Sequence, residues 1–246
     1  MRLIFSESRC QAFVEGIDFV DPSTPTNFRC FADKDYRLLF LRASSPNGMD
    51  NRVVANVRAA AEVGLSVELF IVPDVSGNNM ILNPGNQVVD AVVENLRAAG
   101  ITVRSLWLQV LASSGWSENK ENNVQFISDA IFRMEHRGIR AGIYTTADDW
   151  NHIAPDDVFG VGTDAFVWYY NYTGVGVSGE SAKNFDDFTP FADFTQPKAK
   201  QYGWNETECG QAVNKNIYAS GFTAESTVVR PNRPSTGITV GGVVGF

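Results

Sequence analysis

Histidine, cysteine and long apolar runs are all scarce in this sequence, and each scarcity excludes a class of function. The two histidines, His136 and His152, are too few and too far apart to indicate a metal site. The 246 residues contain no glycine-rich phosphate loop, no Cys-x-x-Cys pair and no serine nucleophile elbow. We therefore expect neither a metal nor a cofactor.

Positive charge is also low. The chain has 20 Lys and Arg against 28 Asp and Glu, a net charge of −8, so we expect no basic patch for nucleic acid or an anionic membrane. No apolar run approaches the ~20 residues of a transmembrane helix. The first residues hold only three consecutive apolar side chains, Leu3 to Phe5, too few for a signal-peptide core. The predicted ligand is therefore neutral or local, with no membrane involved.

Short apolar strands alternate with amphipathic helices through the first part of the chain. Strands are predicted at 16–20, 36–42, 65–72, 106–111 and 139–145. Helices are predicted at about 53–61, 88–99 and 122–137, and they are followed by Gly64, Gly100 and Gly138. This alternation predicts a parallel sheet with packed helices, and the length suits one eight-stranded α/β barrel.

The helical pattern weakens after this point. Two further strands are predicted at 165–172 and 199–204, joined by loops rich in Gly, Ser, Asp and Phe with no long amphipathic helix. We assign residues 1–222 to the barrel domain. Residues 223–246, rich in Ser, Thr, Pro and Gly, are predicted to form a flexible C-terminal tail.

Several motifs spread along the chain together carry a family resemblance. They are Gly16-Ile17-Asp18, Gly142-Ile143-Tyr144-Thr145 before Trp150, Val167-Trp168-Tyr169, Phe188-Thr189-Pro190-Phe191, Lys200-Gln201-Tyr202 before Cys209-Gly210, and Val213-Asn214-Lys215-Asn216-Ile217-Tyr218. From Asp18 to Tyr218 the chain resembles the lysozymes of glycoside hydrolase family 25, in the branch found in nematodes and some protists. The resemblance implies a TIM-like (β/α) barrel with helices missing or reduced around the last three strands.

The strand predicted at 106–111 departs from this family. The family has Trp-Leu-Asp-x-Glu there, whereas this chain has Gln109 and Leu111 at the two acidic positions. Residues two apart on a strand share a face, roughly 6.5–7 Å apart, so the family's two carboxylates enter one cleft. One acid protonates the glycosidic oxygen while the other stabilises the oxocarbenium-like centre or positions a nucleophile. An amide and an isobutyl group can do neither, although Gln109 can still hydrogen-bond a sugar.

The remaining functional positions give a mixed result when they are carried over from the family. Asp18 matches the first active-site aspartate, and Asn214 stands where another cleft aspartate is common. Of four acidic positions, one survives. The resemblance therefore implies a catalytically impaired or inactive muramidase homologue that retains weak glycan binding, for peptidoglycan or chitin-like oligosaccharides, with a role in innate defence against bacteria.

Four further side chains are candidates for sugar contacts: Tyr144, Trp168, Tyr170 and Gln201. Aromatic faces pack on sugar rings and amides hydrogen-bond hydroxyl groups. Core packing is the competing interpretation for each aromatic residue, because large aromatic side chains are mostly buried. Asp18 has a competing interpretation too, as a cap for the segment that follows it.

Two other hypotheses stay open from the sequence. The first is a working hydrolase that uses relocated carboxylates, for which Glu118, Asp148 and Asp149 are candidates because they follow barrel strands at the cleft end. The second is a scaffold without a ligand, which a filled cleft would favour.

The cysteines and two sequons bear on export. The family resemblance pairs Cys30 with Cys209 and leaves Cys10 unpaired, while buried free thiols are the alternative for all three. Glycosylation sequons begin at Asn171 and Asn205. Because the family is typically secreted, we expect an extracellular or secretory protein, and a monomer.

Overall fold

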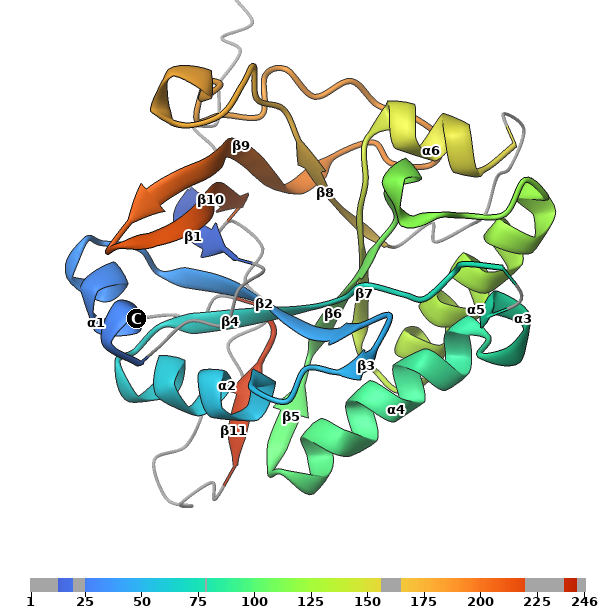
Figure 1. The fold of residues 1–246 in the computed structure, drawn as a ribbon, viewed down its shortest axis with the longest axis horizontal. Coiled ribbons are helices and arrows are strands. Elements are labelled where there is room, and N and C mark those ends of the chain that lie inside the picture. The colour runs from blue at the N-terminus through green and yellow to red at the C-terminus, as the bar shows by residue number, and fades with distance from the viewer. Residues whose placement is uncertain (1–12, 20–24, 78, 156–164, 220–236, 243–246) are drawn as a thin grey trace, which may run out of the picture.

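Eight strands close into a barrel in the computed structural model, which describes residues 13–19, 25–77, 79–155, 165–219 and 237–242 (Figure 1). The barrel strands are β1 (Phe13–Asp18), β2 (Leu38–Ser45), β4 (Ser66–Ile71), β6 (Ser105–Gln109), β7 (Arg140–Tyr144), β8 (Phe166–Tyr170), β9 (Pro197–Glu208) and β10 (Gln211–Ala219). Their order is β1-β10-β9-β8-β7-β6-β4-β2, and a parallel β1–β2 pairing closes the ring. Only β10 runs antiparallel to its neighbours, because the turn at Cys209 and Gly210 reverses the chain directly after β9.

Helices cover one part of the barrel and leave another uncovered. The α-helices are α1 (Pro25–Asp33), α2 (Val53–Glu62), α3 (Asn79–Leu82), α4 (Gly85–Ala98), α5 (Lys120–His136) and α6 (Ala147–Ile153). Between β8 and β10, the only helical element in the described residues is a 3-10 turn, η2 (Val177–Gly179). The expected reduction of helices around the last strands is therefore present in the described part of the chain.

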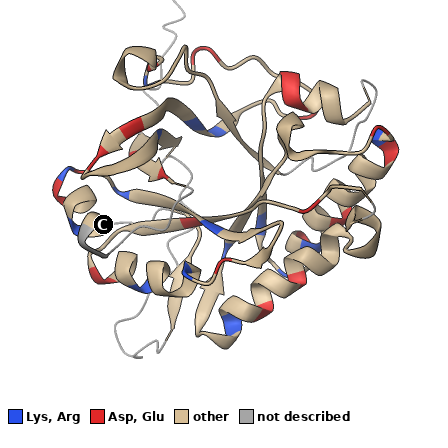
Figure 2. Cartoon of the chain, in the orientation of Figure 1, with Lys and Arg blue, Asp and Glu red and all other residues tan. Residues whose placement is uncertain are grey.

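Ion pairs between acidic and basic side chains link the two longest helices, α4 and α5. Asp90 on α4 pairs with Arg133 on α5 and with Arg137 directly after α5, each at 2.6 Å, and Glu94 pairs with Arg137 at 2.8 Å. Figure 2 shows acidic and basic residues interspersed along these helices. In the described ranges, no helix combines the length and the apolar character that crossing a bilayer requires.

The barrel interior is filled mainly by aromatic side chains. Trp107, Phe40 and Trp168 are buried and in ring contact, with Phe40 stacked on Trp168 at a centroid distance of 4.2 Å. Gly142 makes room for Trp107, because a Cβ at that position would lie 2.3 Å from the indole ring. A second core, in which aliphatic side chains predominate, lies between the strands and the surrounding helices. The interior is therefore packed up to its mouth, as in other α/β barrels.

Part of the predicted C-terminal tail packs against the barrel. Strand β11 (Ile238–Val240) pairs in parallel with β5 (Ile101–Val103). The Gly242 amide then donates to the buried carboxylate of Glu68 at 2.8 Å, which also accepts hydrogen bonds from Ser105, Trp107 and Tyr218. Residues 237–242 are thus held in place, and residues 220–236 and 243–246 lie outside the described part. A short strand, β3 (Gly48–Met49), pairs with the end of β2.

A disulfide joins Cys30 on α1 to Cys209 at the β9–β10 turn, with a Cα–Cα distance of 6.0 Å. Asn27 supports the same junction by donating to the Cys209 carbonyl at 2.9 Å. This is the pairing that the resemblance implies, and free thiols at these two positions are excluded. Cys10 lies outside the described residues.

Candidate functional site

The carboxyl ends of the parallel strands bring the predicted site residues to one mouth. The strand registers set Gln109 beside Tyr144 and Asp18 beside Asn214. Tyr170, the last residue of β8, is in register with Gln201 on β9. Because ligands of α/β barrels bind at this end of the strands, the mouth is the place to look for function.

Asp18 ends β1 as a buried carboxyl group. Its Oδ1 accepts a hydrogen bond from the Asn216 amide at 2.7 Å, and its Oδ2 accepts one from Asn214 at 2.8 Å. Burial raises the pKa of Asp18 from 3.8 to about 6, although the two amide hydrogen bonds act in the opposite direction. Asp18 therefore titrates in a mildly acidic range, with both oxygens already occupied by asparagines.

The two side chains that the family resemblance places at the catalytic positions carry no charge. Gln109 is the partly exposed last residue of β6, and Leu111 follows it and packs against the interior aromatic cluster. The Leu111 carbonyl accepts a hydrogen bond from the Trp116 indole at 3.0 Å. The end of β6 and the residue two positions beyond it thus present an amide and a hydrocarbon near the mouth.

Three of the predicted sugar contacts lie deeper than expected. Trp168 is only 1% exposed, and Phe40 and Tyr144 lie against it at 4.2 and 4.1 Å between ring centroids, so it has no open face for a sugar ring. Its indole donates to Asn216 at 2.9 Å. The buried Gln201 accepts a hydrogen bond from the Tyr144 hydroxyl at 2.8 Å. The prediction that Trp168 stacks on a sugar is corrected: Trp168 and Gln201 position their neighbours.

Among the alternative carboxylates, Asp149 alone is buried near the mouth. Its Oδ1 accepts from the Ala112 amide at 2.8 Å, and its Oδ2 accepts from the Tyr170 and Thr146 hydroxyls, each at 2.9 Å. These contacts tie the segment after β6 to α6 and β8. Glu118 and Asp148 are both exposed.

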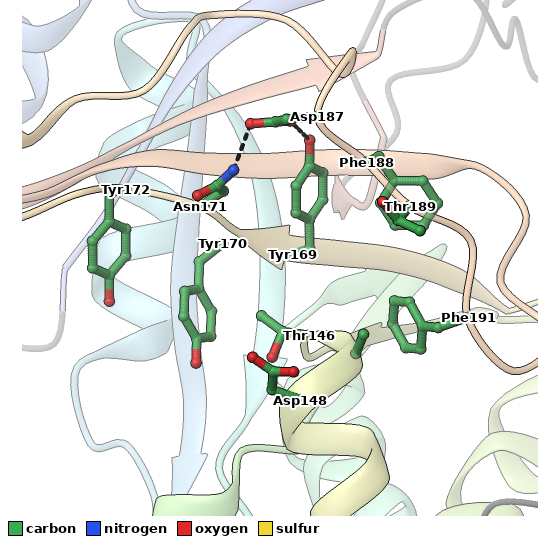
Figure 3. Close-up of a pocket in the computed structure, with 11 residues that line it drawn as sticks. Thr146, Asp148, Tyr169, Tyr170, Asn171, Tyr172, Asp187, Phe188, Thr189 and Phe191 are labelled. Atoms are coloured by element: carbon green, nitrogen blue, oxygen red, sulfur yellow. Dashed lines mark hydrogen bonds between the residues drawn. The ribbon is translucent and has the colours of Figure 1, made fainter.

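A pocket of about 320 Å³ opens beside Tyr170. Figure 3 shows Asp148 and Thr146 on one side of it, and Phe188, Thr189 and Phe191 on another. The Tyr169 hydroxyl points the opposite way from that of Tyr170 and donates to Asp187 at 2.6 Å. The pocket thus combines aromatic walls with hydroxyl and carboxylate groups, a composition that suits a polar ligand with apolar faces.

Sequence reasoning missed three residues at this end of the barrel. Asn216 bridges Asp18 and Trp168, and its position two residues after Asn214 on one strand face was the available signal. Tyr172 stacks on Tyr170 at 5.5 Å, and Trp204 stacks on Tyr172 at 5.4 Å. The Tyr172–Trp204 contact joins segments 32 positions apart in the sequence, so no local pattern indicated it.

Comparison with known proteins agrees with this geometry. A family model described as Lysozyme-like protein 1 matches residues 9–202. Lysozyme-like protein 2 of Caenorhabditis elegans is 35% identical, with 92% of this chain and 82% of that protein covered. A probable GH family 25 lysozyme of Dictyostelium discoideum, numbered 5, is 30% identical, with 82% of this chain and 89% of that protein covered.

The solved structures first define the class of fold. The bacterial lysozyme from Streptomyces coelicolor superposes with a TM-score of 0.62 at 19% identity, covering 83% of this chain and 91% of that one. The architecture is therefore the α/β barrel of glycoside hydrolase family 25. Within that class, the match over residues 9–202 and the C. elegans relative show that the chain belongs to the lysozyme-like protein family.

Proposed function

We propose that this protein binds a peptidoglycan-type or chitin-like glycan at the barrel mouth without hydrolysing it. The observation that carries the proposal is the end of β6, where Gln109 and Leu111 stand in place of two acids. Glycosidic cleavage needs a proton donor and a second carboxylate at the same bond. Binding needs only shape, polar groups and apolar faces, and Tyr170 and the pocket beside it supply these.

Asp18 does not replace the missing pair. Both of its oxygens already accept amide hydrogen bonds, and Asn214 occupies the facing position on β10. A lone carboxyl group can protonate a leaving group or stabilise positive charge, but one group cannot do both at the same time. This supports a site that retains sugar contacts and has lost turnover.

The main competing function is hydrolysis by relocated acids. Asp18, with a pKa of about 6, and the buried Asp149 are the two carboxyl groups that favour it. Against it, the Asp149 oxygens are engaged by Ala112, Thr146 and Tyr170, which fixes them in a structural role. The ligand-free scaffold is less favoured because a pocket of about 320 Å³ is open.

Clearing of a suspension of bacterial cell walls tests the proposal. We expect no measurable lysis, because loss of the general acid alone typically costs a 10²–10⁴-fold rate factor. The double variant Gln109→Asp with Leu111→Glu restores both acids, and we expect it to gain activity where the rest of the cleft is intact. Lysis by the unmodified protein at a rate near that of an active muramidase would contradict the proposal.

We further propose that the protein acts outside the cell, in defence against bacteria. The Cys30–Cys209 disulfide supports export, because such bonds persist in oxidising compartments. Co-sedimentation of the protein with washed bacterial cell walls tests the binding part. Detection of the protein in culture medium tests export.

A further inference from the structure

A row of five aromatic rings runs from the barrel interior to the surface. Trp168, Tyr144, Tyr170, Tyr172 and Trp204 follow one another at centroid distances of 4.1, 6.0, 5.5 and 5.4 Å. The inner two rings are buried, whereas Trp204 at the outer end is 41% exposed. Figure 3 shows Tyr170 and Tyr172 side by side with their hydroxyl groups pointing the same way. The row therefore continues past the candidate site to an open surface.

The outer end of this row is an exposed apolar surface formed by the segment after β8 and by Trp204 on β9. Val175 and Val177 are 53% and 71% exposed, and Val175 forms a parallel bridge with Trp204. We call the surface formed by Tyr172, Val175, Val177 and Trp204 the aromatic shelf. It holds three of the seven large hydrophobic side chains that are exposed in the described residues, so apolar exposure is concentrated there.

Backbone hydrogen bonds fix the shelf before any ligand arrives. The Gly176 amide donates to the Trp204 carbonyl at 2.8 Å, and the Thr173 amide donates to the Gly179 carbonyl at 2.8 Å. Gly179 packs so closely on Gly174 that an added Cβ would lie 2.2 Å from the Gly174 carbonyl oxygen. A preformed surface loses little conformational entropy when it binds.

The chemistry of the shelf favours a neutral polar ligand with apolar faces. Residues 170–179 and 201–205 include no charged side chain. The exposed polar groups beside the rings are hydroxyls and amides, at Thr173, Ser178 and Asn205. Sugar rings combine C–H faces that stack on aromatic rings with hydroxyls that pair with such groups. Glu180 and Glu206, which flank these two ranges, both pair with Lys215, at 3.0 and 2.8 Å.

The shelf is continuous with the mouth. The backbone N–H of Asn205, next to Trp204, donates to the side-chain oxygen of Asn214 at 2.9 Å. The side-chain amide of Asn214 in turn donates to Asp18 at 2.8 Å. Two hydrogen bonds through Asn214 thus connect the backbone beside Trp204 to Asp18. A linear glycan leaving the mouth along β8 and β9 would meet Tyr172 and Trp204 next.

We propose that the aromatic shelf is a second carbohydrate subsite, which stacks on a sugar unit further along a chain held at the mouth, so that the protein prefers long oligosaccharides to short ones. This rests on the glycan binding proposed above. Trp204 provides the stacking surface, Tyr172 holds its orientation, and Val175 and Val177 contact acetyl methyl groups or sugar C–H faces.

Chitin oligomers of two to six units, titrated by calorimetry, test the subsite. We expect affinity to rise with length, with the hexamer at least about tenfold tighter than the dimer, a difference of ~1.4 kcal/mol. Trp204→Ala should remove that gain and leave dimer affinity unchanged, whereas Trp204→Phe should keep most of it. Phe132→Ala is the control, because Phe132 is another exposed aromatic residue, 69% exposed, that lies on α5 and outside the row.

Fluorescence gives a second readout. Trp107, Trp150 and Trp168 are buried, so acrylamide quenching reports mainly on Trp204 and the partly buried Trp116. The hexamer should protect the native protein from quenching, and the dimer should not. Equal hexamer affinity for Trp204→Ala and the native protein, or no dependence on length, would overturn the subsite and leave the proposed function standing. No binding of any oligomer would overturn both. If the native protein sediments as a protein dimer and Trp204→Ala as a monomer, the shelf is an interface between two copies of the protein instead.

Discussion

Asp18 is a carboxyl group that folding places in an unfavourable environment. Burial raises its pKa to about 6, and the amides of Asn214 and Asn216 offset only part of the cost of desolvation. A group of this kind is retained more readily for a binding role than for stability. Replacing Asp18 therefore separates its contribution to binding from its contribution to stability.

We predict that Asp18→Asn changes the pH dependence of stability. The folded pKa of about 6 lies above the unfolded value of 3.8, so the folded state binds more protons between these values. Stability of the native protein should therefore fall as pH rises from about 4 to 6, by on the order of 3 kcal/mol from this group. Urea unfolding at pH 4 and pH 7 measures the difference between variant and native protein. Asp148→Asn, at an exposed position, is the control and should leave the pH dependence unchanged.

At this scale the sequence predicted which residues meet, but not how deeply each lies. Asp18, Gln109, Tyr144 and Tyr170 come to one mouth because strand ends of a barrel converge. Trp168 and Tyr170 share a strand face two residues apart, and nothing local distinguishes the buried ring from the partly exposed one. The burial of Trp168 depends on Phe40, which is more than a hundred positions away.

Among the elements, the β9–β10 hairpin carries charged side chains that are largely buried and ion-paired. Lys215 on β10 contacts Glu206 at 2.8 Å and Glu180 at 3.0 Å. The Glu206 side chain is 1% exposed, so its charge depends on that partner. Polar residues of this kind explain why the sequence predicted a strand at 199–204, whereas β9 extends to Glu208.

We predict that Lys215→Met destabilises the fold by about 3–5 kcal/mol, because it leaves the Glu206 carboxylate buried without a counter-charge. Adding Glu206→Gln should restore much of the loss. Lys183→Met, at an exposed ion pair with Glu15, should cost no more than about 1 kcal/mol. Denaturant midpoints of the three variants measure this, and equal losses for Lys183→Met and Lys215→Met would contradict it.

Strand β11 is the other element that the sequence concealed, since three residues in a Ser-, Thr- and Pro-rich segment carry no period. We predict that ending the chain after residue 236 lowers stability by about 2 kcal/mol or more, because Glu68 loses the Gly242 donor. Ending it after Gly242 should be neutral. Thermal unfolding of the two truncated proteins compares them directly, and matching midpoints would mean that β11 contributes nothing.

The barrel as a whole was predictable from the alternation of strands and helices up to Tyr144, because the spacing of apolar residues along the sequence indicates each of these elements. Helix α6, with seven residues, is too short to show such a period. The closure of the ring by β1 between β2 and β10 is a long-range pairing, which came only through the family resemblance.

We predict that the Cys30→Ala, Cys209→Ala double variant loses about 4–5 kcal/mol of stability on the chain-entropy account, since the bond spans a separation of 179 residues. Reductant should lower the denaturant midpoint of the native protein and leave that of the variant unchanged. A native midpoint that is insensitive to full reduction would show that strand pairing alone holds the ends together.

The same bond bears on survival of the protein after proteolysis. A single cut anywhere between Cys30 and Cys209 would leave both fragments covalently joined, and β1 would remain paired with β10 and β2. A nicked molecule would migrate as one species on a non-reducing gel and as two on a reducing one. In the proposed extracellular role, where bacterial proteases are present, backbone cleavage would then become a local break, with the barrel and its mouth still assembled.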